Sequence, residues 1–305
     1  MSILVLGSFM MDQVVSTPRA PQNGETIIGD SFATYPGGKG ANQAVAASRL
    51  GSEVIMAGKI GDDSNGERFI KTLKNEDINT NWIEVDKDQA TGVGFVISER
   101  DGNNRIIVVP GANLKYDFND LKKLYSVLDK VNVLIMQLEM DIAVMEEAAK
   151  IAKEKGVKVI LNPAPGQKIS NEFMSNIDYL TPNETELEIL TDMKVTSTED
   201  AIQAAKILLN RRVENIIVTL GDNGALVVNK NFEAHVEGYT VPVKDTVAAG
   251  DAFNGALAVS IENNIEITEA IKYANATGAL TVTKNGAIPS IPTRDEVNAF
   301  LNSNE

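Results

Sequence analysis

One stretch of small residues, DTVAAGDAFNG at residues 245–255, constrains this chain more than any other. Residues 247–250 (VAAG) carry little side-chain bulk, so a ligand can approach their backbone closely. From Asp251 onward, apolar residues recur at helical spacing, which predicts a helix. The first turn of a helix has free N–H groups and a partial positive charge, and it therefore binds anions, above all phosphates. The stretch predicts a phosphate-binding loop that leads into a helix.

A carboxylate, Asp251, stands at this same helix start. A negative charge beside a phosphate site costs affinity, and it is tolerated if the carboxylate takes a proton from an acceptor hydroxyl while the amides hold the transferring group. Alternatively, Asp251 merely caps the helix, as aspartate often does. From these residues alone the two interpretations are equally supported.

Composition and charge exclude several classes of function. The chain has 305 residues and a formal net charge of -14, which opposes binding to nucleic acids and to anionic membranes. It contains no cysteine, so disulfides and thiolate chemistry are excluded. The single histidine, His235, lies in the alternating run FEAHVEG and is interpreted as a surface strand residue, which argues against Ser-His-Asp catalysis.

The sequence also bears on where in the cell the protein is located. The opening residues, MSILVLG, lack the basic flank and the length of a signal peptide. No apolar run approaches the length of a membrane span. We therefore expect a cytoplasmic protein without a membrane partner.

Apolar runs and amphipathic segments alternate along the chain. Strands are predicted at residues 3–6, 54–57, 131–136, 157–161, 177–180 and 216–220, with GALVV and its neighbours as the last strands, and helices at 41–50, 142–155 and 201–209. This order predicts an α/β fold, in which helices flank both faces of a mainly parallel central sheet. We expect a single domain over residues 1–305, because no linker or repeat is visible.

Polar residues and a glycine follow several of these predicted strands. Asp12, Glu139, Asn183 and Gly221 all lie just past a strand end. In parallel sheets, ligands bind beyond the C-terminal ends of the strands. This shared placement favours the catalytic interpretation of Asp251 over the cap.

A second glycine-rich turn precedes the helix predicted at 41–50. Gly37, Gly38 and Gly40 flank Lys39, and Asn42 follows in the first helical turn. Lys39 and Asn42 are donors suited to ligand hydroxyls, although a solvent-facing lysine and a turn asparagine would look the same. The turn is not a Walker A loop, and GSFMMD after the first strand lacks the glycines of a dinucleotide-binding motif.

Two β-rich insertions interrupt the alternation, at about residues 12–36 and 91–109. The second contains two strand-like runs around DGNN at 101–104, which predicts a turn. Together the insertions predict a small sheet outside the main sheet, able to act as a lid that excludes water.

Several motifs together resemble the ribokinase-like (pfkB-type) family of sugar kinases over nearly the full length. The two signatures are GGKGANQAVAASRLG at 37–51 and DTVAAGDAFNGAL at 245–257. Supporting matches are KIGDD at 59–63, QLE at 137–139, NPAP at 162–165, PNETE at 182–186 and TLG at 219–221. KGANQ, QLE and GAIPSIP are closer to ribokinases than to fructokinases or adenosine kinases.

The resemblance implies ATP-dependent phosphorylation of the 5-hydroxyl of a pentose, with D-ribose as the expected substrate. Asp251 would be the general base, and the amides of Ala248, Ala249, Gly250 and Asp251 would form the anion hole. The sugar site it implies comprises Met10, Asp12, Gly38, Lys39, Gly40, Asn42, Glu139 and Asp251. Phosphoryl transfer requires mainly positioning and charge stabilisation, which suits this design.

The resemblance also implies cofactors and a partner. The nucleotide site would comprise Asn183, Glu186, Thr219, Gly221, Asp222, Gly224, Gly250 and Asn275, with Asn183 and Glu186 organising Mg²⁺ through water and the phosphates. A K⁺ site would use Asp245, Val247, Thr281, Lys284, Gly286 and Ser290, largely through carbonyl oxygens, although all but Asp245 could be ordinary loop residues. The lid would pair two copies as a homodimer.

Two positions depart from the family pattern. Met10 stands where ribokinases commonly have asparagine, and its thioether cannot pair with a ribose hydroxyl, so a 2-deoxyribose kinase is the alternative. Val247 stands where Thr, Ser or Gly is usual, and the change is neutral if only its carbonyl binds a cation. A sugar- or nucleotide-binding regulator without catalysis is a third possibility, which the retention of Asp251 disfavours.

Overall fold

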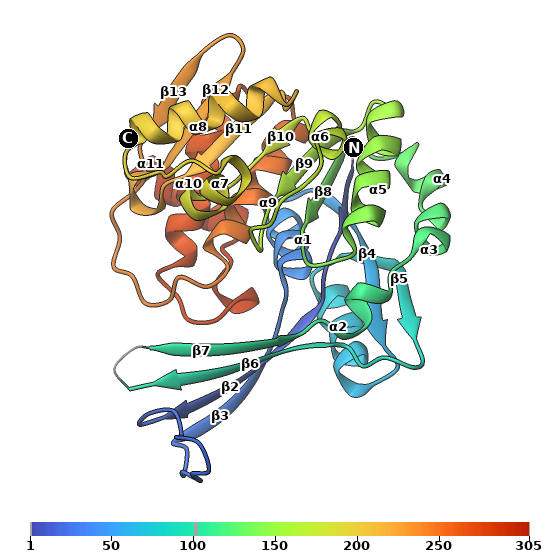
Figure 1. Cartoon of the computed structure of the whole chain (residues 1–305), viewed down its shortest axis with the longest axis vertical. Coiled ribbons are helices and arrows are strands. Elements are labelled where there is room, and N and C mark those ends of the chain that lie inside the picture. Colours follow the sequence, from blue (N-terminus) through green and yellow to red (C-terminus); the bar gives the residue numbers. More distant parts are fainter. Residues whose placement is uncertain (1, 101–102, 305) are drawn as a thin grey trace.

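A nine-stranded sheet forms the centre of the computed structural model, which describes residues 2–100 and 103–304. The strand order is β13-β12-β11-β10-β9-β8-β1-β4-β5 (Figure 1). The strands are β1 (Ser2–Leu6), β4 (Glu53–Gly61), β5 (Asn79–Asp86), β8 (Val133–Gln137), β9 (Lys158–Asn162), β10 (Tyr179–Leu180), β11 (Asn215–Thr219), β12 (Ala225–Asn229) and β13 (Glu233–Val236). Neighbours from β11 to β5 run parallel, whereas β12 and β13 are antiparallel. The predicted α/β fold with a mainly parallel sheet is confirmed.

Helices cover both faces of this sheet. One face carries α1 (Lys39–Arg49), α2 (Ser64–Asn75), α9 (Ala249–Glu262), α10 (Ile267–Thr281) and α11 (Arg294–Ser303). The other carries α3 (Phe118–Lys123), α4 (Tyr125–Leu128), α5 (Ile142–Glu154), α6 (Asn171–Ser175), α7 (Glu184–Thr191) and α8 (Thr198–Asn210). Short 3₁₀ turns lie at η1 (Gly111–Lys115), η2 (Gly221–Asn223) and η3 (Ile288–Ser290).

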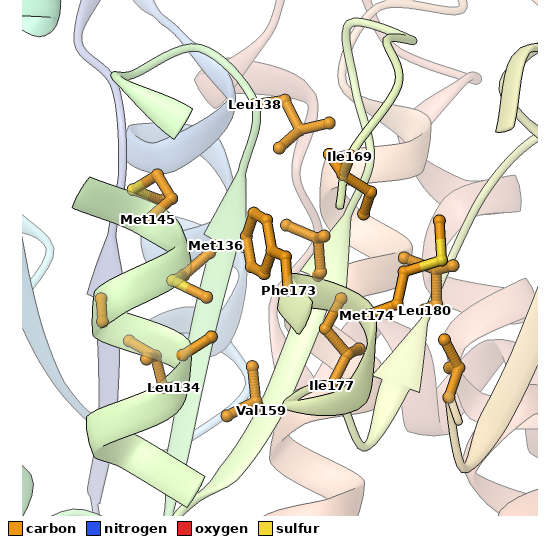
Figure 2. Close-up of a cluster of buried hydrophobic side chains, with 14 of the residues drawn as sticks. Leu134, Met136, Leu138, Met145, Val159, Ile169, Phe173, Met174, Ile177 and Leu180 are labelled. Carbon is orange, nitrogen blue, oxygen red and sulfur yellow. The ribbon is translucent and has the colours of Figure 1, made fainter. Parts of the chain in front are cut away.

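Because successive side chains of a strand point to opposite faces of the sheet, the strands contribute to two separate hydrophobic cores. In β1, Ile3 and Val5 pack under α1 and α9, whereas Leu4 and Leu6 pack under α5. Figure 2 shows the second core, where side chains of β8, β9, α5 and α6 meet in a cluster that includes Phe173. Strands buried on both faces read as continuous apolar runs, which is why they were predictable.

A second, four-stranded sheet projects from the main body (Figure 1). Its order is β3-β2-β6-β7, with β2 (Met10–Thr17), β3 (Ser31–Gly37), β6 (Gly92–Glu99) and β7 (Asn104–Val109). These strands fall in the two β-rich insertions, and we call them the small sheet. Of the turn predicted at 101–104, Asp101 and Gly102 lie outside the described residues. The small sheet exposes apolar side chains, namely Val15, Phe32, Tyr35, Phe95, Ile106, Ile107, Val108 and Val109.

Three helix starts differ from their predicted positions: α8, predicted from Ala201, begins at Thr198, and the other two lack a capping side chain. The helix predicted from Ala41 begins at Lys39, directly after Gly38, whose φ of 87° turns the chain. The helix predicted from Asp251 begins at Ala249, and its N-cap is Ala248 with a left-handed φ of 63°. Neither cap residue is a side-chain capper, so no capping signal marked either start.

One strand is longer than predicted. The strand expected to end at Ala57 continues as β4 to Gly61, and α2 follows after the N-cap Asp63, which accepts a hydrogen bond from the Gly66 amide. His235 lies exposed on β13, as predicted. No helix within the described residues combines the length and apolar character that crossing a bilayer requires.

Candidate active site

The Asp251 carboxylate is held by side chains from another helix. It is 7 % exposed and forms part of the first turn of α9. Asn42 Nδ2 of α1 donates to Asp251 Oδ2 at 2.8 Å, and Gln43 Nε2 donates to Oδ1 at 3.0 Å. Ala248 occupies the N-cap, and no side chain of the described residues caps this helix. The interpretation of Asp251 as a helix cap is therefore wrong.

A buried relay of amides fixes Gln43 in turn. Gln137 Nε2 donates to Gln43 Oε1 at 2.7 Å, and Gln43 Nε2 also reaches Asn162 Oδ1 at 3.2 Å. Gln137 and Asn162 are the last residues of β8 and β9. The sequence-based list of site residues missed all three. Polar residues closing two otherwise apolar strands were the available signal, since a buried amide needs a partner.

The backbone around the start of α9 has free donors. The amides of Gly250 and Asp251 donate to no acceptor in the part of the chain that the structure describes, as the first turn of a helix dictates. The Ala249 amide makes a long bond of 3.4 Å to the Thr246 carbonyl. The left-handed conformation at Ala248 ends the preceding loop and starts the helix.

Gly250 itself has open space beside it. Apart from its chain neighbours and the backbone of α9, a Cβ added at this position would meet no heavy atom of the described residues within 4 Å, so packing against the rest of the protein does not demand a glycine here. Asn254 Nδ2 donates to the Gly250 carbonyl at 2.8 Å, and Thr181 Oγ1 donates to Asn254 Oδ1 at 2.7 Å. Asn254 and Thr181, which sequence reasoning missed, thus fix the carbonyl of Gly250. The space where a side chain of residue 250 would lie stays open.

Further polar groups gather next to Asp251, at the base of the small sheet. Glu139 Oε2 accepts hydrogen bonds from Ser8 Oγ and from the Lys39 amide, the latter at 3.1 Å. Asn42 Oδ1 is buried and has no hydrogen-bond partner in the structure. A ligand that donates a hydrogen bond to this oxygen would gain stability, because a buried acceptor without a partner costs free energy.

Asp12 faces this same region from β2. Burial, and after it the negative charges of Glu139 and Asp251, raise the pKa of Asp12 to about 6. The fit between β2 and β6 is close, since a Cβ added at Gly94 would lie 2.6 Å from Asp12 Oδ1. That Cβ would lie 3.8 Å from Met10 Cγ, so the side chains of Met10 and Asp12 both lie beside Gly94.

Lys39 supplies the positive charge among these carboxylates. Burial lowers the pKa of a lysine, yet the fields of Asp251, Glu139 and Glu186 outweigh it, and the pKa of Lys39 lies above its ordinary value. The ammonium therefore stays charged at neutral pH. Gly38 lies against the backbone of Met10, where a Cβ would meet the Met10 amide nitrogen at 2.6 Å, and Gly40 is equally crowded by Gly7.

Two adjoining cavities meet at the start of α9. One, of about 220 Å³, is lined by Lys39, Asn162, Asn183, Glu186, Thr219, Asn254 and residues 248–251. The other, of about 650 Å³, is lined by Asn183, Thr219, Gly221, Asp222, Gly224, Asn275 and the pair 249–250, with an apolar wall that includes Val243, Phe253 and Val282. The apolar wall was missed in the sequence. All the predicted nucleotide-site residues therefore line one or both cavities.

Asn183 and Glu186 form a reciprocal cap at the start of α7. The Glu186 amide donates to Asn183 Oδ1 at 2.8 Å, and the Asn183 amide donates to Glu186 Oε2 at 2.9 Å. Burial raises the pKa of Glu186, while the Asn183 amide and Lys39 oppose the rise. Both residues line the 220 Å³ cavity, and their side-chain oxygens are a donor set that suits Mg²⁺ held through water.

The predicted K⁺ residues are only partly brought together by side chains. Asp245 Oδ1 accepts from the Val247 amide at 3.0 Å, and Oδ2 accepts from the Gly286 amide at 2.9 Å. Other side chains of the set point elsewhere, since Thr281 bonds the Thr277 carbonyl, Ser290 the Ala287 carbonyl and Lys284 the Glu296 carboxylate. Any cation here would be held by Asp245 and carbonyl oxygens.

The pfkB family of carbohydrate kinases matches residues 1–294 of this chain. Among curated relatives, a ribokinase of Haemophilus influenzae is 40% identical over 98% of both chains. A deoxyribokinase of Salmonella typhi is 36% identical over 100% of both.

Solved structures agree with the sequence relatives. A ribokinase of Arabidopsis thaliana, complexed with ribose and ATP, superposes with a TM-score of 0.93 at 32% identity, covering 98% of both chains. A ribokinase of Thermotoga maritima superposes with a TM-score of 0.90 at 36% identity, covering 99% of both. The motif-based resemblance is thus confirmed, and the chain belongs to the pfkB family of carbohydrate kinases.

Proposed function

We propose that this chain transfers the γ-phosphoryl group of ATP to the 5-hydroxyl of a pentose, with D-ribose as the preferred substrate. The observation that carries the proposal is the buried Asp251 carboxylate, held by Asn42 and Gln43 beside the open first turn of α9. The similar ribokinase of Arabidopsis thaliana, complexed with ribose and ATP, supports the choice of substrates.

The sugar would occupy the space between Asp251 and the small sheet. Its hydroxyls would donate to Asp12, Glu139 and the unmet Asn42 Oδ1, and its 5-hydroxyl would face Asp251. The nucleotide would lie in the 650 Å³ cavity, with the purine against the apolar wall. The 220 Å³ cavity between the two would hold the transferring phosphoryl group.

Asp251 would accept the proton of the 5-hydroxyl as the sugar oxygen attacks the γ-phosphorus, and ADP would leave. The free amides of Gly250 and Asp251 would bind the oxygens of the transferring group, and Lys39 would offset their charge. Mg²⁺, held by Asn183 and Glu186 through water, would neutralise the phosphates. K⁺ beside Asp245 would fix the loop that precedes α9, and the use of ATP supports a cytoplasmic location.

The direct test is sugar-dependent turnover of ATP with Mg²⁺ and K⁺ present. We expect ADP and ribose 5-phosphate in equal amounts when D-ribose is supplied, and little ADP without a sugar. Equal ATP hydrolysis with and without sugar, or no turnover with any furanose, would contradict the proposal.

A second candidate is phosphorylation of 2-deoxy-D-ribose. Met10, 5 % exposed, presents a thioether beside Asp12, and such a group makes no hydrogen bond to a 2-hydroxyl. The similarity to the Salmonella typhi deoxyribokinase supports this candidate as well. A catalytically inactive regulator is disfavoured, because the base and the open phosphate loop are both intact.

We also propose that the small sheet closes over the sugar and pairs with a second copy. Its exposed apolar side chains, among them Phe32 at 63 % and Ile107 at 65 %, form a surface that water hydrates poorly. Pairing two such sheets would bury these side chains and remove the free edge of β7.

A further inference from the structure

A second large cavity lies at the opposite end of α9 from Asp251. Its volume is about 710 Å³, and it is bordered by the C-terminal ends of α1 and α9, the start of β4, and parts of α10 and α11. Glu262 follows Asp251 by 11 residues on α9 (262 − 251), which places it roughly 16 Å from the catalytic carboxylate along the helix. The cavity shares no lining residue with either cavity of the candidate active site.

A buried carboxylate with one unmet oxygen forms part of the wall. Glu262 is 6 % exposed. Its Oε2 accepts from Ser52 Oγ at 2.5 Å, whereas Oε1 is buried and has no hydrogen-bond partner among the described residues. Leaving a buried charged acceptor unpaired costs more than a typical hydrogen bond contributes. A ligand with a donor group, above all a cationic one, would satisfy this oxygen.

The same cavity is also lined by an arginine that has no ion-pair partner among the described residues. Arg294, the first residue of α11, is exposed, and its guanidinium makes no hydrogen bond or ion pair with the rest of the described chain. It lies against Gly51, where a Cβ would be 3.3 Å from Arg294 Nη1. A guanidinium of this kind binds carboxylates in a bidentate manner.

The charge balance of the wall selects the class of ligand. Three carboxylates, Glu53, Glu262 and Glu269, face two cations, Lys272 and Arg294. A multiply charged anion such as a sugar phosphate would meet net repulsion, in a chain whose formal charge is already -14. A zwitterion meets neither penalty, because its ammonium can pair with Glu262 while its carboxylate pairs with Arg294.

We propose that this cavity is a binding site for a free α-amino acid or a similar small zwitterion, distinct from the kinase site. The ammonium would donate to Glu262 Oε1 and the carboxylate would accept from Arg294. The side chain would fill the apolar part of the cavity, near Val259, Ile265 and Leu301.

The test uses the full chain and a panel of the common L-amino acids. Each is added at millimolar concentration, and the melting temperature is recorded, since a ligand that binds only the folded state raises it. Any amino acid that raises it is then titrated by calorimetry beside its N-acetyl derivative and its decarboxylated amine. We expect at least one amino acid to bind and both derivatives to bind at least tenfold more weakly.

Two variants assign the contacts. Glu262→Gln should bind the amino acid at least tenfold more weakly and no longer discriminate against the N-acetyl derivative. Arg294→Met should also bind it at least tenfold more weakly, and should no longer discriminate against the amine. Arg105→Met, an exposed arginine on β7, is the matched control and should bind as wild type does.

Because Arg294 is exposed, the Arg294→Met variant should fold. It therefore tests the proposal even if Glu262→Gln fails to fold. The proposal is overturned if no amino acid binds at millimolar concentration. It is also overturned if binding is unchanged in Arg294→Met, because the ligand would then lie elsewhere. Because the readout is binding, these outcomes are independent of whether the chain phosphorylates ribose.

Discussion

At the scale of single residues, the site concentrates negative charge that the fold does not neutralise. Asp12, Glu139 and Asp251 act on one another through space, and Lys39 is the cation among them. Such an arrangement costs stability and is kept where a ligand uses it. In the proposed complex, the hydroxyls of the sugar would donate further hydrogen bonds to these carboxylates.

Asp12 allows this cost to be measured. Its pKa of about 6 exceeds the ordinary value of 3.8, so between these values the folded chain keeps a proton that the unfolded chain has lost. The free energy of unfolding therefore falls as pH rises through that range. Relative to wild type, Asp12→Asn should gain roughly 1 kcal/mol between pH 5 and 7 in urea unfolding. A pH-independent difference would show that Asp12 titrates normally.

We expect Met10 to set how strongly the enzyme distinguishes ribose from 2-deoxyribose. A site that hydrogen-bonds a hydroxyl rejects the analogue lacking it by ~10⁴–10⁵, whereas an apolar wall discriminates by only ~10². We expect kcat/KM for the two sugars to lie within roughly a hundredfold of each other. Met10→Asn should shift the ratio toward ribose by about 1–2 kcal/mol. An unchanged ratio, or refusal of 2-deoxyribose by wild type, would show that residue 10 does not read the 2-position.

At the scale of elements, the sequence predicted the strands better than the starts of the helices. Strands such as β8 are apolar on both faces, and that signal is local. The start of α9 depends on Ala248 in a left-handed conformation, which its residue type does not announce. The relay from Gln137 through Gln43 to Asp251 joins three elements and needs the packed sheet to be seen.

The loop before α9 should respond to monovalent cations. Asp245 accepts two backbone amides there, and K⁺ bound to its remaining lone pairs would hold the anion hole in shape. Activity should rise when K⁺ replaces Na⁺ at constant ionic strength, and Asp245→Asn should weaken that response. With Mg²⁺ saturating, an enzyme indifferent to the exchange would have no catalytically relevant cation at this loop.

At the scale of the whole molecule, the two sheets have different tasks. The nine-stranded sheet places polar residues at the ends of its parallel strands, which the alternation of strands and helices predicted. The pairing order of the small sheet was not predictable, because β2 and β6 pair in parallel across distant parts of the chain. Several of its apolar side chains, among them Phe32 and Ile107, are exposed.

That surface predicts a dimer. Light scattering after size exclusion should give about twice the chain mass of 32.8 kDa. Because neighbouring residues on β7 point to opposite faces, Ile106→Glu combined with Ile107→Glu places a charge on each face and should yield monomers. If the wild-type chain is itself monomeric, the double substitution will leave the measured mass unchanged. That result would refute pairing through the small sheet.

The central claim is that Asp251 is the general base. Asp251→Asn keeps the size of the side chain, so the variant should fold and bind ribose as wild type does, with Asp192→Asn on the surface as the charge-matched control. Positioned proton transfer is worth ~10²–10⁴ in rate, so kcat should fall by at least that factor while calorimetric ribose affinity is retained. Near-normal kcat in folded Asp251→Asn would contradict the account.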